Sequence, residues 1–124
     1  MSRPLRIAID LRPAALASIS GVGVVTIGVI EALAERGHTF VGISDRPVPP
    51  GRMAPTIPVL AEGVPGGRVR WEAFVLPRLL RRLDPAPDLY HAAWNHGVPG
   101  ARPFPSVLTI HDLIPWRLPD QVPW

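Results

Sequence analysis

The chain has 124 residues, of which 47% are hydrophobic and 19% are charged, and this composition indicates a globular domain rather than a disordered chain. All thirteen basic residues are arginine, the net charge is only +3, and no basic stripe is interleaved with aromatic residues, which argues against a nucleic-acid-binding protein. Cysteine is absent, and this excludes disulfides, zinc–thiolate sites and a cysteine nucleophile.

The start of the chain and its hydropathy predict a cytoplasmic protein. The first six residues lead directly into a five-residue apolar run, which is too short for the core of a signal peptide. No run approaches the roughly eighteen apolar residues of a membrane span. Arg78, Arg81 and Arg82 fall on one short predicted helix, where they form either a solvated face or a patch that contacts anionic lipid at the inner membrane surface.

The first predicted unit is a strand, a glycine loop, a helix and a second strand. Residues 7–11 form an apolar run that ends at Arg12-Pro13, as expected of a buried parallel strand. Gly21-Val22-Gly23 is predicted to form a loop, and residues 24–36 show helical spacing of apolar side chains. Residues 39–44 form the next strand, so the unit is βαβ with a right-handed crossover.

The middle of the chain is predicted to be loop-like and then helical. Residues 46–70 contain six prolines and four glycines, with residues 56–60 as a short edge strand. A helix follows, in which the apolar residues expected to pack on the sheet are Trp71, Phe74, Val75, Leu79, Leu80 and Leu83. Pro77 predicts a kink or a new helical turn at that residue. The alternation of strands and helices predicts an α/β fold, a Rossmann-like three-layer sandwich with a mainly parallel sheet.

Polar side chains follow the last predicted strand, which covers residues 106–110. His111 and Asp112 come directly after it, and polar groups at the carboxyl end of a strand usually face a ligand crevice. His111 is therefore expected to contact a ligand, although a core histidine satisfied by backbone groups is the alternative. Asp112 is expected either in the site or as the cap of the next turn.

The preceding strand, which begins near Asp88, also leads into polar and aromatic residues. Asn95 and His96 are candidates for hydrogen bonding to a sugar, and Trp94 either stacks on a sugar or packs half-buried. The histidine spacing fits no compact zinc motif, so no metal is expected.

The glycine segment has three interpretations. It approaches a ligand phosphate or sugar, it is a plain tight turn, or it belongs to a dinucleotide-binding fold. Against the third, ten residues separate Asp10 from Gly21, whereas dinucleotide-binding glycines follow the first strand at once. In its favour, Asp45 stands where a ribose-binding acid would.

Five segments, in order along nearly the whole chain, resemble the N-terminal domain of family 4 glycosyltransferases. They are RIAIDLRP at residues 6–13, Gly21-Val22-Gly23 with the helix that ends ALAERGH at residues 32–38, the Trp71-Glu72 helix with LPRLL at residues 76–80, DLYH at residues 88–91, and TIHDLIP at residues 109–115.

The resemblance implies a GT-B fold of two Rossmann-like domains and retaining transfer of a sugar, of hexosyltransferase type. The sugar passes from a nucleotide-sugar donor to a glycan, lipid or small-molecule acceptor, with no cofactor. By position in the family, Gly21, Val22 and Gly23 would lie near the donor phosphates, and His111 and Asp112 would be catalytic beside the transferred sugar. His91, Asn95 and His96 would lie on the acceptor side.

Two features depart from the family pattern. Val24 and Val25 replace an arginine and a tyrosine that often follow the glycines, which removes a cation suited to phosphate. The chain also ends at Trp124, so residues 1–124 are expected to be a single, incomplete N-terminal domain without its C-terminal donor-binding domain, inactive alone. The alternatives are a gene remnant or non-catalytic module that binds a separate subunit, and a small NAD-binding Rossmann-type protein.

Overall fold

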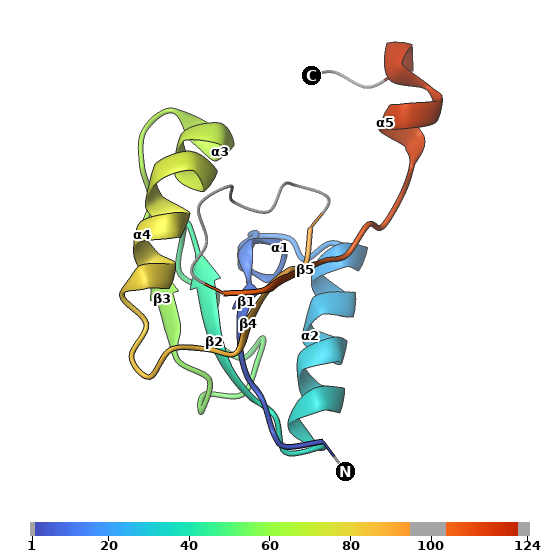
Figure 1. The fold of residues 1–124 in the computed structure, drawn as a ribbon. Helices are drawn as coiled ribbons and strands as arrows, with labels where there is room; N and C mark the ends of the chain where they lie inside the picture. Colours follow the sequence, from blue (N-terminus) through green and yellow to red (C-terminus); the bar gives the residue numbers. More distant parts are fainter. Residues whose placement is uncertain (1, 95–103, 122–124) are drawn as a thin grey trace.

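A five-stranded sheet forms the centre of the computed structural model, which describes residues 2–94 and 104–121 (Figure 1). The strand order is β3-β2-β1-β4-β5, and every neighbouring pair is parallel. The strands are β1 (Arg6–Asp10), β2 (Thr39–Ser44), β3 (Val59–Ala61), β4 (Leu89–Ala92) and β5 (Ser106–Leu108). The predicted α/β fold with a mainly parallel sheet is confirmed.

Helices cover both faces of this sheet, which gives the three predicted layers. Helix α2 (Gly21–Ala34) lies on one face, and α3 (Gly67–Arg70) and α4 (Leu76–Arg81) lie on the other (Figure 1). Side chains alternate along β1, so Ile7 and Ile9 pack with Ile30 of α2, whereas Ala8 packs in the opposite cluster with Trp71.

The strand order reverses between β1 and β4. The chain runs outward from β1 through β2 to β3, and then returns across the sheet to place β4 on the other side of β1. In open parallel sheets, ligands bind outside the carboxyl ends of the strands at such a reversal. The fold therefore points to the carboxyl edge around β1 and β4 as the place to look for a site.

The glycine segment begins a helix, so its predicted loop conformation is wrong. Gly21 and Gly23 belong to the first turn of α2, whose N-cap is Ser20, and the Ser20 hydroxyl accepts a hydrogen bond of 3.3 Å from the Gly23 N–H. A Cβ on Gly23 would lie 2.5 Å from the Pro13 carbonyl oxygen, whereas a Cβ on Gly21 would meet nothing within 4 Å. Gly23 therefore lets α2 approach the short helix α1 (Arg12–Ala15) closely.

A π turn (η1, Trp71–Val75) joins α3 to α4. The Leu76 N–H donates to the Trp71 carbonyl, five residues back, and Pro77 then falls in the first turn of α4, where its missing N–H is harmless. The new helical turn predicted at Pro77 is thus confirmed, with the helix beginning one residue earlier. The predicted inward position of Phe74 is wrong, because the wider π turn shifts the helical phase and leaves this side chain 69% exposed.

The predicted edge strand at residues 56–60 forms later in the chain. It is β3, and it does lie at the edge of the sheet beside β2. Pro58 has no N–H to donate, and it contributes only its carbonyl, which accepts a bond of 2.8 Å from the Gly42 N–H. Strand pairing therefore starts at Val59.

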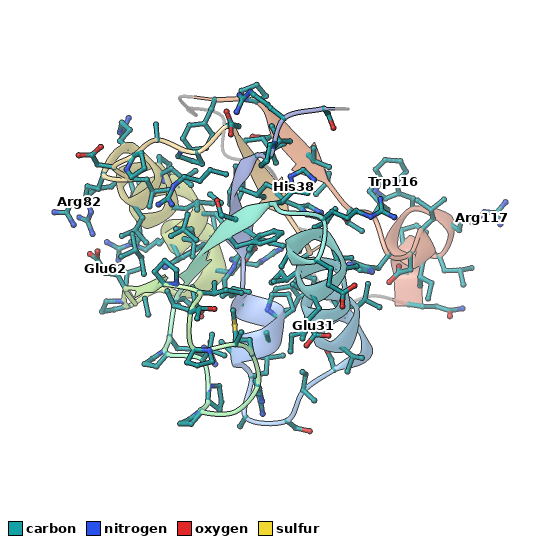
Figure 2. The ribbon with its side chains drawn as sticks, turned by 90° about the horizontal axis from the view of Figure 1, so that it is seen from below. Glu31, His38, Glu62, Arg82, Trp116 and Arg117 are labelled. Carbon is teal, nitrogen blue, oxygen red and sulfur yellow. The ribbon has the colours of Figure 1, made fainter. Side chains whose placement is uncertain are left out.

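The segment after β5 extends away from the sheet (Figure 1). It carries α5 (Ile114–Arg117) and a turn of 3-10 helix, η2 (Pro119–Gln121), and Trp116 and Arg117 stand apart from the body of the molecule (Figure 2). Its apolar side chains are exposed, and so are those of Val107 and Leu108 in β5. Among the described residues, no helix is both long enough and apolar enough to cross a membrane.

Candidate functional site

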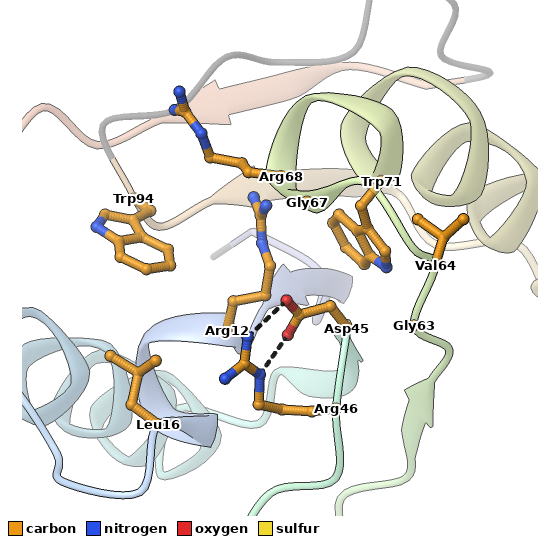
Figure 3. A pocket seen from close by; sticks show the side chains of 10 residues that line it. All are labelled: Arg12, Leu16, Asp45, Arg46, Gly63, Val64, Gly67, Arg68, Trp71 and Trp94. Carbon is orange, nitrogen blue, oxygen red and sulfur yellow. Dashed lines mark hydrogen bonds and ion pairs between the residues drawn. The ribbon is translucent and has the colours of Figure 1, made fainter. Parts of the chain in front are cut away.

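A pocket of about 510 Å³ opens at the carboxyl edge of the sheet (Figure 3). Its walls come from the segments that follow four different strands, β1, β2, β3 and β4, as the strand reversal leads one to expect. The described residues that line it are Arg12, Leu16, Asp45, Arg46, Gly63, Val64, Gly67, Arg68, Trp71 and Trp94.

Arg12 forms the floor of the pocket, and two carboxylates hold it in place. Its Nη2 donates to Asp10 Oδ2 at 2.6 Å, its Nε donates to Asp10 Oδ1 at 3.0 Å, and its Nη1 donates to Glu72 Oε1 at 2.9 Å. The Arg12 side chain is only 4% exposed. Strand β1 thus supplies the acid, the first residue of α1 supplies the cation, and η1 supplies the second acid.

The same guanidinium lies between two indole rings. Its Cζ is 4.4 Å from the Trp71 ring centroid and 5.8 Å from that of Trp94, on the opposite side (Figure 3). Burial by itself would lower the pKa of Arg12, but the hydrogen bond and the charge of Asp10, together with Glu72, outweigh burial and raise it. Arg12 is therefore a permanent positive charge that lies against both rings.

Asp45 and Arg46 follow β2 and form a second ion pair on the pocket wall. Arg46 Nε donates to Asp45 Oδ1 and Arg46 Nη2 donates to Asp45 Oδ2, each at 3.0 Å. This fork-shaped hydrogen bonding raises the pKa of Arg46. Because both oxygens of Asp45 accept from Arg46, this carboxylate is engaged with protein, which weakens its case as a ribose-binding acid.

Gly67 contributes main chain to the wall opposite Arg46 (Figure 3). Gly67 has a φ of +77°, and a Cβ there would meet nothing within 4 Å. A side chain at Gly67 would therefore occupy the space next to the pocket, and its absence lets a ligand approach the main chain. Arg68 is exposed and adds another guanidinium on this side (Figure 3).

The two predicted histidines at this edge are held by neighbouring segments. His91 Nε2 lies 2.7 Å from Thr109 Oγ1, and His111 Nε2 donates to the Ala93 carbonyl at 2.8 Å. Burial lowers the pKa of His91, the charge of Asp10 opposes this shift, and His111 adds to it. Because Leu89 and Ala93 pack beneath α2, alternation along β4 places His91 on that face of the sheet.

The remaining predicted residues divide into three cases. Asp112 Oδ1 accepts a bond of 3.0 Å from the Ile114 N–H, so it caps the following turn, which was its structural alternative. Asn95 and His96 lie outside the described residues. Gly21, Val22 and Gly23 stand at the start of α2 and are not among the residues lining the pocket. Their assigned roles toward donor and acceptor stay predictions.

Sequence reasoning missed most of the pocket. Arg12 and Arg46 were considered only as residues at which strands stop, Arg68 only as part of a loop-like segment, and Trp71 only as a helix residue. The pattern that would have found the first two is a charged side chain within two residues of the end of a buried strand, similar to the pattern that singled out His111. Trp94, for which stacking on a ligand and half-buried packing were both open, lines the pocket and lies over Arg12.

Tyr90 of β4 lies in the core behind Arg12. Its hydroxyl is buried and has no hydrogen-bond partner among the described residues. Burial raises the pKa of Tyr90 well above 10, and the charge of Asp10 adds to this effect. Within the described ranges, no group of three or more histidine and carboxylate side chains is placed to hold a metal ion.

An all-parallel sheet with helices on both faces defines a Rossmann-like α/β domain, and its polar pocket lies at the carboxyl edge. A family model described as Glycosyltransferase Family 4 matches residues 19–124, and the chain belongs to this family. No curated protein and no solved structure matches the chain.

Proposed function

We propose that this chain is the acceptor-side domain of an enzyme that transfers a sugar from a nucleotide-sugar donor to an acceptor. The observation that carries the proposal is the pocket at the strand reversal, in a chain of the glycosyltransferase family. The pocket combines an indole ring with fixed guanidinium and carboxylate groups, which suits a polar ring compound. The acceptor occupies this pocket, on the α3 side of the carboxyl edge.

His111 and Gly21 belong to the donor in this proposal. His111, whose Nε2–H is directed to the Ala93 carbonyl, stands by the transferred sugar, and Gly21 leaves room at the start of α2 for the donor phosphates. Gly23 is glycine because a side chain there would clash with the Pro13 carbonyl. Asp112 caps the turn that follows β5. Stabilising the departing diphosphate takes a second set of hydrogen-bond donors, which a C-terminal domain or a separate subunit supplies.

The test is nucleotide-sugar turnover by the protein as its gene expresses it, including any reading frame that continues or adjoins this one. We expect release of the nucleotide diphosphate that depends on an acceptor. His111→Ala should lower kcat/KM by about 10²–10³, the usual cost of removing a group that stabilises the transition state. His38→Gln is the matched control, because His38 lies at the other end of the sheet, where its Nδ1 accepts from the Leu5 N–H. Turnover that is unaffected by His111→Ala contradicts the assigned role of His111.

A non-catalytic binding module is the second candidate, and the exposed apolar side chains of β5 and α5 favour it. Trp116 is 78% exposed, and Ile110 and Ile114 are also exposed. A group of exposed apolar side chains within one short segment is typical of a face that meets another protein surface. A folded chain that turns over no nucleotide sugar, and that co-purifies stoichiometrically with one subunit, would favour this candidate.

A further inference from the structure

The charges that face the pocket are mostly positive. Among its ten described lining residues are three arginines and one carboxylate, Asp45. The acids that hold Arg12, Asp10 and Glu72, are not among the lining residues, so Arg12 presents its cation to the pocket and has its carboxylates behind it. Because Asp10 and Glu72 neutralise Arg12, the positive charge that a ligand meets comes mainly from the exposed guanidinium groups of Arg46 and Arg68.

The three arginines are not equivalent as ligand contacts. Arg12 uses Nε, Nη1 and Nη2 to bind Asp10 and Glu72, so it serves as a fixed part of the floor. Arg46 is 54% exposed and uses only Nε and Nη2 for Asp45. Its Nη1 makes no hydrogen bond to any described residue, and Asp45 holds the guanidinium in one orientation. Arg46 is therefore a pre-oriented donor with N–H groups left for a ligand.

Arg68 contributes from the other side of the pocket. Its side chain projects from α3 and is separated from Arg46 by the Arg12 side chain (Figure 3). At that separation, in a partly solvated pocket, its effect on an anion beside Arg46 is a modest attraction through the field. Trp94 provides a half-buried aromatic surface between the two arginines, against which the apolar face of a ring can pack.

We propose that this pocket binds a phosphate monoester carried on a sugar ring, with the phosphate on Arg46 and the ring against Trp94. A phosphate monoester carries close to two negative charges and three acceptor oxygens at pH 7, which suits the N–H groups that Arg46 leaves unused and the nearby charge of Arg68. A carboxylate carries one charge. The volume of about 510 Å³ lies within the range of small-molecule sites. Resting on the function proposed above, this inference makes the acceptor of the transfer a sugar phosphate.

The test is direct binding with no nucleotide sugar present. The probes are the 6-phosphates of glucose, mannose and galactose, the three parent sugars, glucuronate and inorganic phosphate, titrated calorimetrically into the wild-type chain. We expect at least one hexose phosphate to bind ten or more times tighter than its parent sugar, glucuronate and inorganic phosphate. Raising the salt from 50 to 200 mM should weaken this binding, because the contact is between ions.

Variants locate the contact. Arg46→Gln should weaken hexose-phosphate binding at least tenfold, and Arg46→Lys should restore part of it, since lysine keeps the charge but loses the fork. Arg68→Gln should weaken it about two- to fivefold, through its charge alone. Arg81→Gln is the control, because Arg81 is an exposed arginine on α4 that does not line the pocket, and it should leave binding unchanged.

Three outcomes would overturn the inference: no hexose phosphate binds better than its parent sugar, inorganic phosphate binds as tightly as the hexose phosphates, or Arg46→Gln binds like the wild type. The measurement is independent of catalysis. A chain that binds hexose phosphates through Arg46 but turns over no nucleotide sugar would keep the pocket assignment and refute the transferase proposal. An active transferase whose pocket binds no hexose phosphate would keep the transferase proposal and refute the pocket assignment.

Discussion

Replacing Gly23 with alanine should destabilise the fold, and the same replacement at Gly21 should not. The two glycines lie two residues apart in the first turn of α2, so the same glycine-to-alanine change is made in the same helical turn. They differ in surroundings. An alanine Cβ at position 23 would lie 2.5 Å from the Pro13 carbonyl oxygen and 2.7 Å from Ile19 Cγ1, whereas one at position 21 has open space for 4 Å.

The size of the effect follows from these contacts. The Pro13 carbonyl is backbone of the buried helix α1, so relief of the clash requires α1 and α2 to move apart. Overpacking of this kind costs about 1–3 kcal/mol, while replacing glycine with alanine in a helix gains up to about 1 kcal/mol. The gain is common to both positions. The free energies of unfolding of the two variants should therefore differ by about 1–3 kcal/mol.

Thermal unfolding followed by circular dichroism measures this difference. At roughly 4 °C per kcal/mol for a chain of this size, Gly23→Ala should melt about 4–12 °C below Gly21→Ala. Two variants that melt within about 1 °C of each other would refute the close approach of α1 and α2. Turnover assays on the same two variants test the proposed donor site. If donor phosphates approach Gly21, Gly21→Ala should reduce nucleotide-sugar turnover without loss of stability.

Three further predictions concern buried polar groups. Arg12→Leu should lower the free energy of unfolding at pH 7 by about 3–5 kcal/mol in urea titrations, because it leaves the 1%-exposed Asp10 carboxylate without its cation; a loss below about 1 kcal/mol would contradict this. Tyr90→Phe should cost nothing or stabilise the fold, since it removes a buried hydroxyl that has no partner among the described residues. It should also reduce the loss of stability that the wild type shows above pH 10, where the unfolded tyrosine ionises and the buried one does not. The folded pKa of His91 is lowered, so its neutral form is favoured by folding; the stability it contributes is complete above pH 6.5 and is lost as the pH falls below that value. His91→Gln should therefore make the free energy of unfolding depend less on pH below 6.5. An unchanged pH dependence would refute the lowered pKa of His91.

The order of strands and helices was predictable from sequence because each element has its own periodicity. The apolar runs of β1 and β2 and the glycine-rich connections between elements are local features, and they were sufficient for the α/β class. Phe74 was misplaced because helical spacing assumes 3.6 residues per turn, and nothing in the sequence around Pro77 announces a π turn. The start of α2 was placed too late because glycine suggests a loop unless the capping role of Ser20 is considered.

The candidate site was only partly predictable for a different reason. A residue that follows a buried strand can be recognised, and this placed His91, His111 and Trp94 at the carboxyl edge. Which face of the sheet each one serves depends on the strand order, which one-dimensional patterns do not contain. The cluster of Arg12, Asp10 and Glu72 joins residues about sixty positions apart, and only the packing of η1 on β1 brings them together.

The π turn has a consequence for how this pocket can change during evolution. It holds one residue more than an α-helical turn would, and it lies between the pocket residues of α3 and the core residues of α4. Loss of a single residue from it would rotate α3 by about 100° relative to α4, carrying Gly67 and Arg68 away from the pocket while Leu79 and Leu80 stayed in the core. Ligand preference at this wall can therefore diverge between relatives by one insertion or deletion, with no substitution among the residues that touch the ligand.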